Sequence, residues 1–208
     1  MKLLSDCQLY TFIDTAYLHG RDPTVIARAL CEGGSDVIQL RAKDVPADRV
    51  REMARAILPI TRAANVGLVI NDFPEIAKEV GADLCHLGQE DYFEDGKRSS
   101  IPFGLSSHSP DQALRAIATR PAYVAIGPVY ATATKPGAKP VTLDYVRWAA
   151  ANVTLPWFAI GGITLQNVDD VLKAGAQRIC VVSAILNQAD VRQACQAFQQ
   201  HLLSAAPD

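Results

Sequence analysis

The chain lacks several features that would assign it to a specialised class of protein. Its cysteines are an odd number, Cys7, Cys31, Cys85, Cys180 and Cys195, and they form neither a Cys-x-x-Cys pair nor a group with histidine at metal-ligand spacing. A disulfide framework and a zinc site are therefore not indicated. A reducing cytoplasm fits this use of cysteine best, and we expect the protein there.

An excess of charge of one sign is also lacking. The 20 Lys and Arg residues stand against 22 Asp and Glu residues, which gives a formal net charge of -2. Nucleic acids and anionic membranes are usually bound by a basic block or stripe, so we expect neither as a partner. No run approaches the ~18 apolar residues of a membrane span, and Asp6 interrupts the N-terminal segment early. We expect a soluble, unprocessed protein that acts on small molecules.

What is present is enough apolar sequence for one core. The chain has 208 residues, of which 49% are hydrophobic. This amount is sufficient for one sizeable domain and calls for neither a second domain nor disorder. We therefore predict a single domain over residues 1–208, and the oligomeric state, a homo-oligomer included, stays open.

Short apolar runs alternate with longer segments of helical period. The runs that predict strands are 9–13, 37–40, 67–70, 84–87, 103–105, 123–126, 156–160 and 179–182. Helices are predicted over 23–30 after Asp22 as N-cap, 47–64, 74–80, 110–119, 143–151, 166–174 and 191–203, with an irregular polar stretch over 89–100.

Eight strand–helix units with nearly continuous apolar strands indicate a parallel sheet covered by helices, closed as an α/β barrel of the (β/α)₈ or TIM type. The chain is short for that fold, so its loops must be brief. The alternative is an open, doubly wound sheet. Against it, the first strand has no G-x-G-x-x-G, and Gly33-Gly34 follows a helix, where glycines are typical of a C-cap.

Polar residues gather where the predicted strands end. They are Gln39, Arg41 and Lys43; Asn71 and Asp72; His86, Gln89, Glu90 and Asp91; Ser106, Ser107 and His108; and Thr132, Thr134 and Lys135. A single polar residue after a strand is usually a turn or a helix cap. In a barrel, however, the C-terminal ends of all strands meet at one mouth, where catalytic groups gather. The coincidence over these five strands predicts a site.

Two cations and an amide follow the second strand at alternate positions. Alternation sends Gln39, Arg41 and Lys43 to the same side of the strand, so they can face the mouth together and bind an anion. The alternative is that Arg41 and Lys43 are surface groups paired with Asp44 or Asp48.

Two carboxylates end neighbouring strands. Asp72 and Asp91 could share one Mg²⁺, which is usually held by carboxylates together with substrate phosphates. Asp72 could instead be the N-cap of the helix that follows. Together with the cations and hydroxyls, the pair predicts a pocket for a magnesium-bound pyrophosphate.

A second phosphate position is predicted at the seventh and eighth strands. Gly161-Gly162 and Val182-Ser183 follow these strands, where TIM barrels commonly hold a phosphate on exposed backbone N–H groups. Glycines let the backbone approach closely. Two phosphorylated substrates are therefore suggested.

Seven segments in the same order resemble the thiamine-phosphate synthase (thiamine-phosphate pyrophosphorylase) family. They are Gln-Leu-Arg-Ala-Lys (39–43), Ile-Asn-Asp (70–72), His-Leu-Gly-Gln-Glu-Asp (86–91), Gly-Leu-Ser-Ser-His (104–108), Gly-Pro-Val-Tyr-Ala-Thr-Ala-Thr-Lys (127–135), Ala-Ile-Gly-Gly-Ile (159–163) and Val-Val-Ser-Ala-Ile (181–185). The resemblance implies a TIM barrel that joins hydroxymethylpyrimidine pyrophosphate to a thiazole phosphate with Mg²⁺. It also implies a dissociative mechanism, in which pyrophosphate leaves before the thiazole nitrogen attacks.

The resemblance also implies the roles of individual residues. The pyrimidine pyrophosphate would be bound by Gln39, Arg41, Lys43, Asn71, Ser106 and Lys135, and Mg²⁺ by Asp72 and Asp91. The thiazole phosphate would be bound by Thr132, Thr134, Gly162, Val182 and Ser183, with Leu40, Ala42 and Ala133 also counted as substrate-binding. Catalysis would rest on Arg41, Lys43, Lys135 and Ser106, without a protein nucleophile.

Two other functions are weighed against the synthase. A thiazole tautomerase of the same barrel type would use a histidine at the position of His108 as acid or base. Its relatives generally lack the Gln-Glu-Asp of 89–91 and the Thr-x-Thr-Lys of 132–135, both of which are present. A non-catalytic sensor of a phosphorylated ligand would be expected to lose Asp72, Asp91 or the cations.

Overall fold

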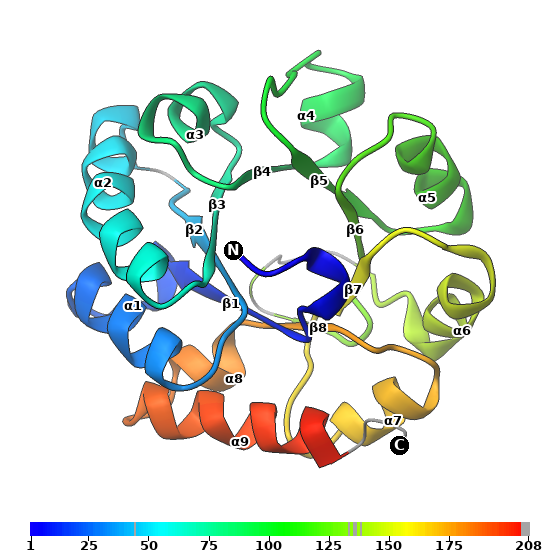
Figure 1. The fold of residues 1–208 in the computed structure, drawn as a ribbon. Helices are drawn as coiled ribbons and strands as arrows, with labels where there is room; N and C mark the ends of the chain where they lie inside the picture. The colour runs from blue at the N-terminus through cyan, green and yellow to red at the C-terminus, as the bar shows by residue number, and fades with distance from the viewer. Residues whose placement is uncertain (44, 133, 135–136, 138, 205–208) are drawn as a thin grey trace.

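The strands close into one parallel barrel in sequence order. A computed structural model describes residues 1–43, 45–132, 134, 137 and 139–204. The strands are β1 Leu9–Asp14, β2 Val37–Arg41, β3 Gly67–Asn71, β4 Leu84–Leu87, β5 Phe103–Ser107, β6 Tyr123–Ile126, β7 Trp157–Ile160 and β8 Ile179–Val181. Figure 1 shows them as a ring with helices outside it. The predicted TIM barrel is confirmed, and the open sheet is wrong.

The helices follow the predicted alternation. They are α1 Pro23–Glu32, α2 Ala47–Ala63, α3 Pro74–Val80, α4 Gln89–Phe93, α5 Pro110–Ile117, α6 Thr142–Asn152, α7 Val168–Lys173, α8 Ser183–Leu186 and α9 Val191–Ser204, with the 3-10 turns η1 Leu4–Asp6 and η2 Thr15–Tyr17. Asp22 caps α1 as predicted, because its side chain accepts a hydrogen bond from the Thr24 N–H. The polar stretch predicted to be irregular contains α4, and α8 is an additional short helix.

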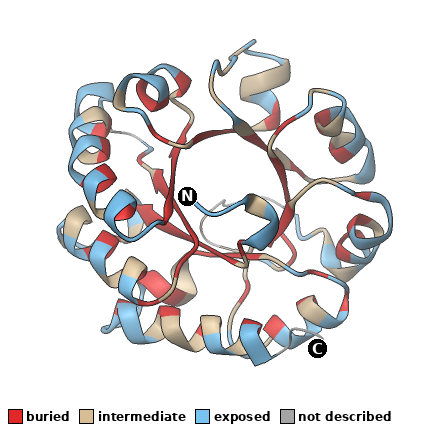
Figure 2. Ribbon diagram, viewed as in Figure 1, coloured by how far each residue is buried: buried red, intermediate tan, exposed pale blue. Residues whose placement is uncertain are grey.

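Aromatic rings fill the interior of the barrel. Strand residues are almost all buried, whereas the outer helix faces are exposed (Figure 2). Tyr10 of β1 lies edge-on to Tyr123 of β6 and to Phe158 of β7, with ring centroids 5.7 Å and 5.3 Å away. Tyr123 and Phe158 are also edge-on, at 5.5 Å. Edge-to-face packing is favourable for such rings, and it forms a solid layer across the barrel.

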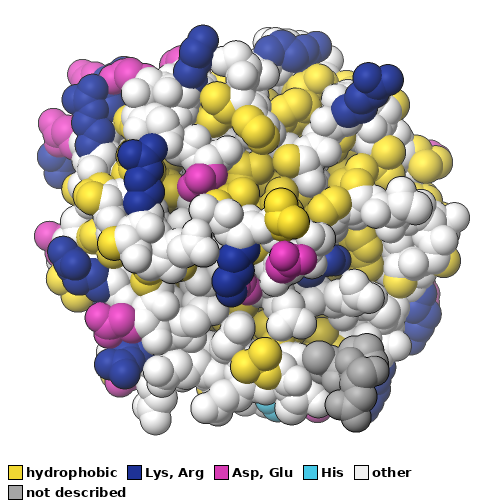
Figure 3. Space-filling model, in the orientation of Figure 1, with side chains coloured by type: hydrophobic (Ala, Val, Ile, Leu, Met, Phe, Trp, Pro, Cys, Tyr) yellow, Lys and Arg dark blue, Asp and Glu magenta, His cyan; other side chains and the backbone are white. Residues whose placement is uncertain are grey.

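The N-terminal segment lies over the end of the barrel where the strands begin. Figure 1 shows η1 across the centre of the ring. The Arg178 guanidinium donates hydrogen bonds to the carbonyls of Leu4 and Ser5, and Lys2 pairs with Asp36 at 2.6 Å. Figure 3 shows charged side chains of both signs interspersed over this face. The covered end leaves the opposite end of the barrel for a site.

We searched the described residues for a helix that combines the length and the apolar composition required to cross a bilayer, and none does.

Candidate active site

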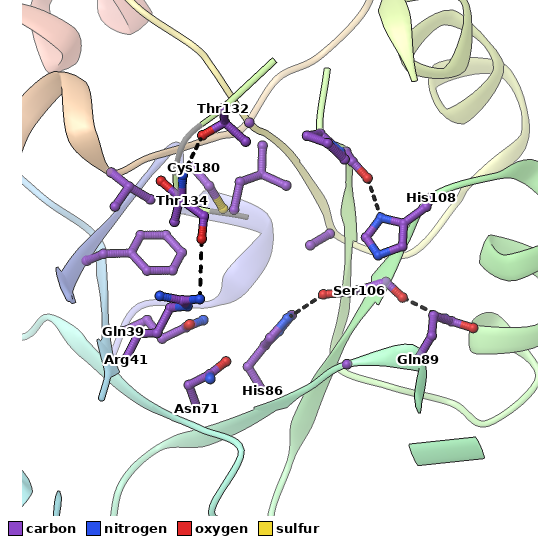
Figure 4. A pocket seen from close by; sticks show the side chains of 18 of the residues that line it. Gln39, Arg41, Asn71, His86, Gln89, Ser106, His108, Thr132, Thr134 and Cys180 are labelled. Carbon is purple, nitrogen blue, oxygen red and sulfur yellow. Dashed lines mark hydrogen bonds between the residues drawn. The ribbon is translucent and has the colours of Figure 1, made fainter. Parts of the chain in front are cut away.

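A cavity of about 360 Å³ lies where the strands end, and most of the predicted site residues line it. The predicted residues in its wall are Gln39, Arg41, Lys43, Asn71, Asp72, Asp91, Ser106, Thr132, Thr134, Gly162, Val182 and Ser183. Figure 4 shows several of them converging from different strands. Leu40 and Ala42 are buried and do not line the cavity. Ala133 and Lys135 lie outside the described residues.

Arg41 faces the cavity and is held there by a buried carboxylate. Its guanidinium donates to Asp14 at 2.7 Å and to the Thr134 carbonyl at 3.4 Å. The Asp14 side chain is only 1% exposed and also accepts from the Ala16 N–H. Such a charge-assisted pair fixes the direction of the guanidinium. Sequence reasoning missed Asp14, although it ends β1 directly beside Arg41 in the sheet register.

Lys43 is also at the cavity, but it is more loosely held. Its ammonium lies 3.6 Å from Asp72 and is more than half exposed. The alternative pairing with Asp48 is not found, because Asp48 pairs with Arg51. The other suggested partner, Asp44, lies outside the described part of the chain.

The carboxylates of Asp72 and Asp91 both line the cavity. Asp72 has a positive φ of 65°, which is uncommon for a residue other than glycine, and its N–H donates to the His86 carbonyl of β4. The α3 N-cap is Phe73, without a side-chain capping bond, so the suggested capping role of Asp72 is wrong. Asp91 accepts from Lys97 at 2.6 Å through one oxygen and from the Gly88 N–H through the other.

The two carboxyls titrate differently. Burial, and then the charge of Asp91, raise the pKa of Asp72 although Lys43 and Lys97 oppose them. Burial also acts to raise the pKa of Asp91, but the hydrogen bond and charge of Lys97 outweigh it, and this pKa is lowered. A divalent cation would lower the electrostatic cost of holding one partly buried carboxylate beside a second one.

Within the described ranges, no three His, Cys, Asp or Glu side chains gather where they could hold a metal ion together. Mg²⁺ usually takes only one or two carboxylates and completes its shell with water and substrate phosphates. Asp72 and Asp91 therefore fit a magnesium ion that binds together with a diphosphate.

A chain of buried hydrogen bonds crosses the floor of the cavity. The Gln39 amide donates to the Tyr10 hydroxyl at 2.7 Å, and the hydroxyls of Tyr10 and Tyr123 are 2.9 Å apart. His86 Nδ1 lies 2.8 Å from the Tyr123 hydroxyl, and His86 Nε2 lies 2.9 Å from Ser106 Oγ. Burial raises the pKa of both tyrosines well above their ordinary value. Gln39 and Ser106 were predicted site residues, whereas the two tyrosines were missed as strand residues.

Ser106 is also held from the outer side. The Gln89 amide donates to the Ser106 carbonyl at 2.6 Å, and the Arg115 guanidinium donates to the Gln89 side-chain oxygen at 2.7 Å. Arg115 in turn lies over the Phe93 ring, 3.9 Å from its centroid. The position of Ser106 is thus fixed by residues of both α4 and α5.

The predicted phosphate turns follow β7 and β8, which lie across the closed barrel from β3 and β4. Gly161 and Gly162 follow β7 with φ of 102° and 65°, and a Cβ on Gly162 would lie 2.7 Å from the Ala131 carbonyl oxygen. A side chain would therefore be both strained and crowded at this position. The Asn167 amide donates to the Gly162 carbonyl and accepts from the Thr164 N–H, which fixes the turn. Ser183 also lines the cavity and is the first residue of α8.

Thr132 and Thr134 lie close together at the cavity (Figure 4). The Thr134 N–H donates to Thr132 Oγ1 at 3.2 Å, and the Tyr17 hydroxyl of η2 lies 3.1 Å from Thr134 Oγ1. The Thr134 carbonyl also accepts a hydrogen bond from the Arg41 guanidinium, so this segment reaches the end of β2. Tyr17 is a contact that sequence reasoning did not find.

The cysteines near the site are core residues. Cys85 and Cys180 are buried and free of disulfides, although Cys180 also contributes to the cavity lining. Burial raises the pKa of the Cys85 thiol to about 12 and that of Cys180 well above its ordinary value. Neither thiol is therefore activated as a nucleophile.

Comparisons with known sequences all identify similarity to thiamine-phosphate synthases. The TMP-TENI family model, described as thiamine monophosphate synthase, matches residues 9–185. A thiamine-phosphate synthase of Thermus thermophilus is 45% identical over 182 residues, which are 86% of this chain and 88% of the relative. One of Herpetosiphon aurantiacus is 42% identical over 200 residues, or 94% and 97% of the two chains.

A solved structure agrees with these relatives. The thiamine phosphate pyrophosphorylase of Pyrococcus furiosus has a TM-score of 0.87 and 27% identity, with 99% of this chain and 100% of that chain covered. The fold, the arrangement of the cavity and the sequence relatives are consistent with one another. The chain belongs to the thiamine monophosphate synthase family.

Proposed function

We propose that the chain joins 4-amino-2-methyl-5-hydroxymethylpyrimidine pyrophosphate to a thiazole phosphate, giving thiamine monophosphate and pyrophosphate. The observation that carries the proposal is that two groups suited to anions line one cavity. Arg41, Lys43 and the carboxylate pair follow β2, β3 and β4, and the Gly161-Gly162 turn follows β7, across the closed barrel from β3. The family to which the chain belongs supports the same reaction. The proposed location is the cytoplasm, as expected from the scattered cysteines.

Mg²⁺ is the proposed metal, and Asp72 and Asp91 would hold it. When bound, it would neutralise part of the charge that develops on the departing diphosphate. Arg41 and Lys43 add positive charge in the same cavity, and Ser106 and Asn71 add polar groups. Lys135 keeps its proposed place in this set on the strength of the sequence resemblance.

The proposed reaction is dissociative. The bond between the pyrimidine methylene carbon and the pyrophosphate oxygen breaks, and pyrophosphate leaves with the electron pair. The aminopyrimidine stabilises the methylene cation, and the thiazole nitrogen then forms the new C–N bond. The work of the protein is to stabilise the leaving group and to orient the two rings, with the thiazole phosphate held by Thr132, Thr134, Gly162, Val182 and Ser183.

The proposal is tested by supplying the purified chain with both substrates and Mg²⁺ and identifying the product by mass spectrometry. Lys43→Ala and Asp91→Ala should each lower kcat by roughly 10²-fold or more, because each removes charge stabilisation of the leaving group. Circular dichroism should show that both variants fold. The matched controls Lys78→Ala and Asp95→Ala change exposed residues outside the cavity wall and should keep normal turnover.

Near-normal turnover in both cavity variants would refute the assigned roles.

A separate assay supplies the wild-type chain with the thiazole carboxylate phosphate alone. Isomerisation of that compound, without formation of thiamine monophosphate, would favour the tautomerase instead.

A further inference from the structure

The buried chain that links Gln39 to Ser106 runs through Tyr10, Tyr123 and His86, which lie in the floor of the same cavity. Tyr10, Tyr123 and His86 are 1%, 0% and 8% exposed. They come from β1, β6 and β4, so the barrel closure brings together residues far apart in the sequence. Figure 4 shows the two ends of the chain, Gln39 and Ser106, at the cavity. The chain thus connects two ligand-facing groups through the floor.

The hydrogen-bonding capacity of each member gives the chain a direction. A phenol has one proton to donate, and the Tyr10 oxygen already accepts from the Gln39 amide. Its proton therefore goes to the Tyr123 oxygen, which is the other hydrogen-bond partner of this hydroxyl among the described residues. In the opposite direction the Tyr10 proton would be buried without an acceptor, which proteins avoid.

The same reasoning continues to the cavity. Tyr123 uses its proton toward His86 Nδ1, so Nδ1 carries the lone pair and Nε2 carries the proton. The Nε2–H donates to Ser106 Oγ. Ser106 then has its own hydroxyl proton available for a ligand in the cavity. Diphosphate oxygens accept hydrogen bonds and do not donate them, so this direction suits the proposed ligand.

We propose that Tyr10 and Tyr123 hold His86 in the neutral Nε2–H tautomer, and that His86 thereby makes Ser106 a hydrogen-bond donor toward the leaving diphosphate. His86 and the tyrosines are positioning residues in this scheme, since they act through Ser106. The ligand end of the inference rests on the proposed function, whereas the tautomer does not. At the other end, Gln39 keeps its side-chain oxygen as an acceptor for a donor group of the ligand.

The first experiment measures the tautomer in the ligand-free protein. Nitrogen-15 NMR of the histidine-labelled chain at neutral pH distinguishes protonated from unprotonated ring nitrogens, and His86→Gln identifies the His86 signals among the four histidines. We expect an unprotonated Nδ1 and a protonated Nε2. An Nδ1–H tautomer, or a ring protonated at both nitrogens, would overturn the inference whatever the enzymatic activity.

The second experiment removes the hydroxyl that fixes the tautomer. Tyr123→Phe should give a mixture of His86 tautomers and weaken the binding of pyrophosphate with Mg²⁺ about tenfold by calorimetry, since a hydrogen bond to a charged group is affected. Tyr145→Phe is the matched control, because its buried hydroxyl bonds to Ser107 and to the Ser109 carbonyl, outside the chain. It should change neither measurement.

Unchanged pyrophosphate binding in a folded Tyr123→Phe variant would contradict the role of the chain. If Tyr123→Phe does not fold, Tyr10→Phe serves in its place, and the tautomer of the wild-type protein still decides the inference. Absence of thiamine monophosphate synthesis would refute the proposed function but leave the tautomer measurement valid. The two failures are therefore distinguishable.

Discussion

The two carboxylates of the proposed metal pair have opposite effects on the metal-free fold. The pKa of Asp72 is raised, mainly by burial and then by Asp91, so the folded protein favours its protonated form. The free energy of unfolding should therefore fall as the pH rises through this pKa. The pKa of Asp91 is lowered because Lys97 outweighs burial, so its stabilising effect is present at neutral pH and is lost on acidification.

This difference predicts opposite stability changes for two similar substitutions. In metal-free protein at pH 7, Asp72→Asn should raise the melting temperature, whereas Asp91→Asn should lower it. Asparagine keeps the shape of the side chain and tolerates the positive φ of residue 72. Both variants should lose turnover by roughly 10²-fold or more, because both remove a ligand of the proposed metal. Thermal melts in a chelating buffer measure the effect, and shifts of the same sign would contradict the argument.

At the scale of elements, the pairing of β5 with β6 requires a glycine in β5 beside the Tyr123 ring of β6. A Cβ on Gly104 would lie 2.1 Å from the Tyr123 ring. Because Gly104 pairs with Tyr123 in the sheet register, neither strand can move aside without breaking its ladder. Because Gly104 has no side chain, the Tyr123 ring, a member of the buried hydrogen-bond chain, fits beside it.

Gly104→Ala should therefore destabilise the protein by about 1–3 kcal/mol through overpacking. For a domain of this size that is a fall in melting temperature of roughly 2–12 °C. A double variant with Tyr123→Leu tests the cause, since the smaller side chain should reduce the cost of the added methyl group. Strictly additive effects of the two substitutions would show that the contact with the ring is not responsible.

The strands and most helices could be predicted because burial on both faces of a parallel barrel leaves apolar runs, and each outer helix keeps one apolar face. The helices α4 and α8 were not predicted, since five and four residues are too few to show a helical period. The boundaries of the predicted elements differ from the observed ones by at most two residues, and those of β4, β6 and α3 agree at both ends.

The sequence predicted which residues lie at the site, but not which side chains contact one another there. The ends of the strands placed Arg41, Asp72 and Ser106 at one mouth. The carboxylate that holds Arg41, in contrast, depends on the register of two strands, and the contact between Tyr10 and Tyr123 joins residues 113 positions apart. Such contacts depend on the closure of the barrel, which leaves no periodic signal in the sequence.

At the scale of the whole molecule, the two ends of the barrel have different tasks. The cavity lies at the end where the strands finish, and the N-terminal segment covers the other end (Figure 1). Arg178 fastens that segment by hydrogen bonds of 3.2 Å to the Leu4 carbonyl and 2.7 Å to the Ser5 carbonyl. Arg178 is partly buried, and this burial lowers the pKa of its guanidinium. In TIM barrels the end opposite the active site generally contributes to stability.

Arg178→Ala should therefore separate stability from activity. Loss of hydrogen bonds from a charged donor costs about 1.5–3 kcal/mol, which corresponds to a fall in melting temperature of roughly 3–12 °C. The ratio kcat/KM should stay within about twofold of the wild type, since no catalytic interaction is removed. Arg192→Ala is the control, because it breaks an exposed pair with Glu32 and should shift the melting temperature far less. A large loss of kcat/KM in Arg178→Ala at an unchanged melting temperature would mean that the covered end is coupled to the cavity through the aromatic layer, and the division of tasks would be wrong.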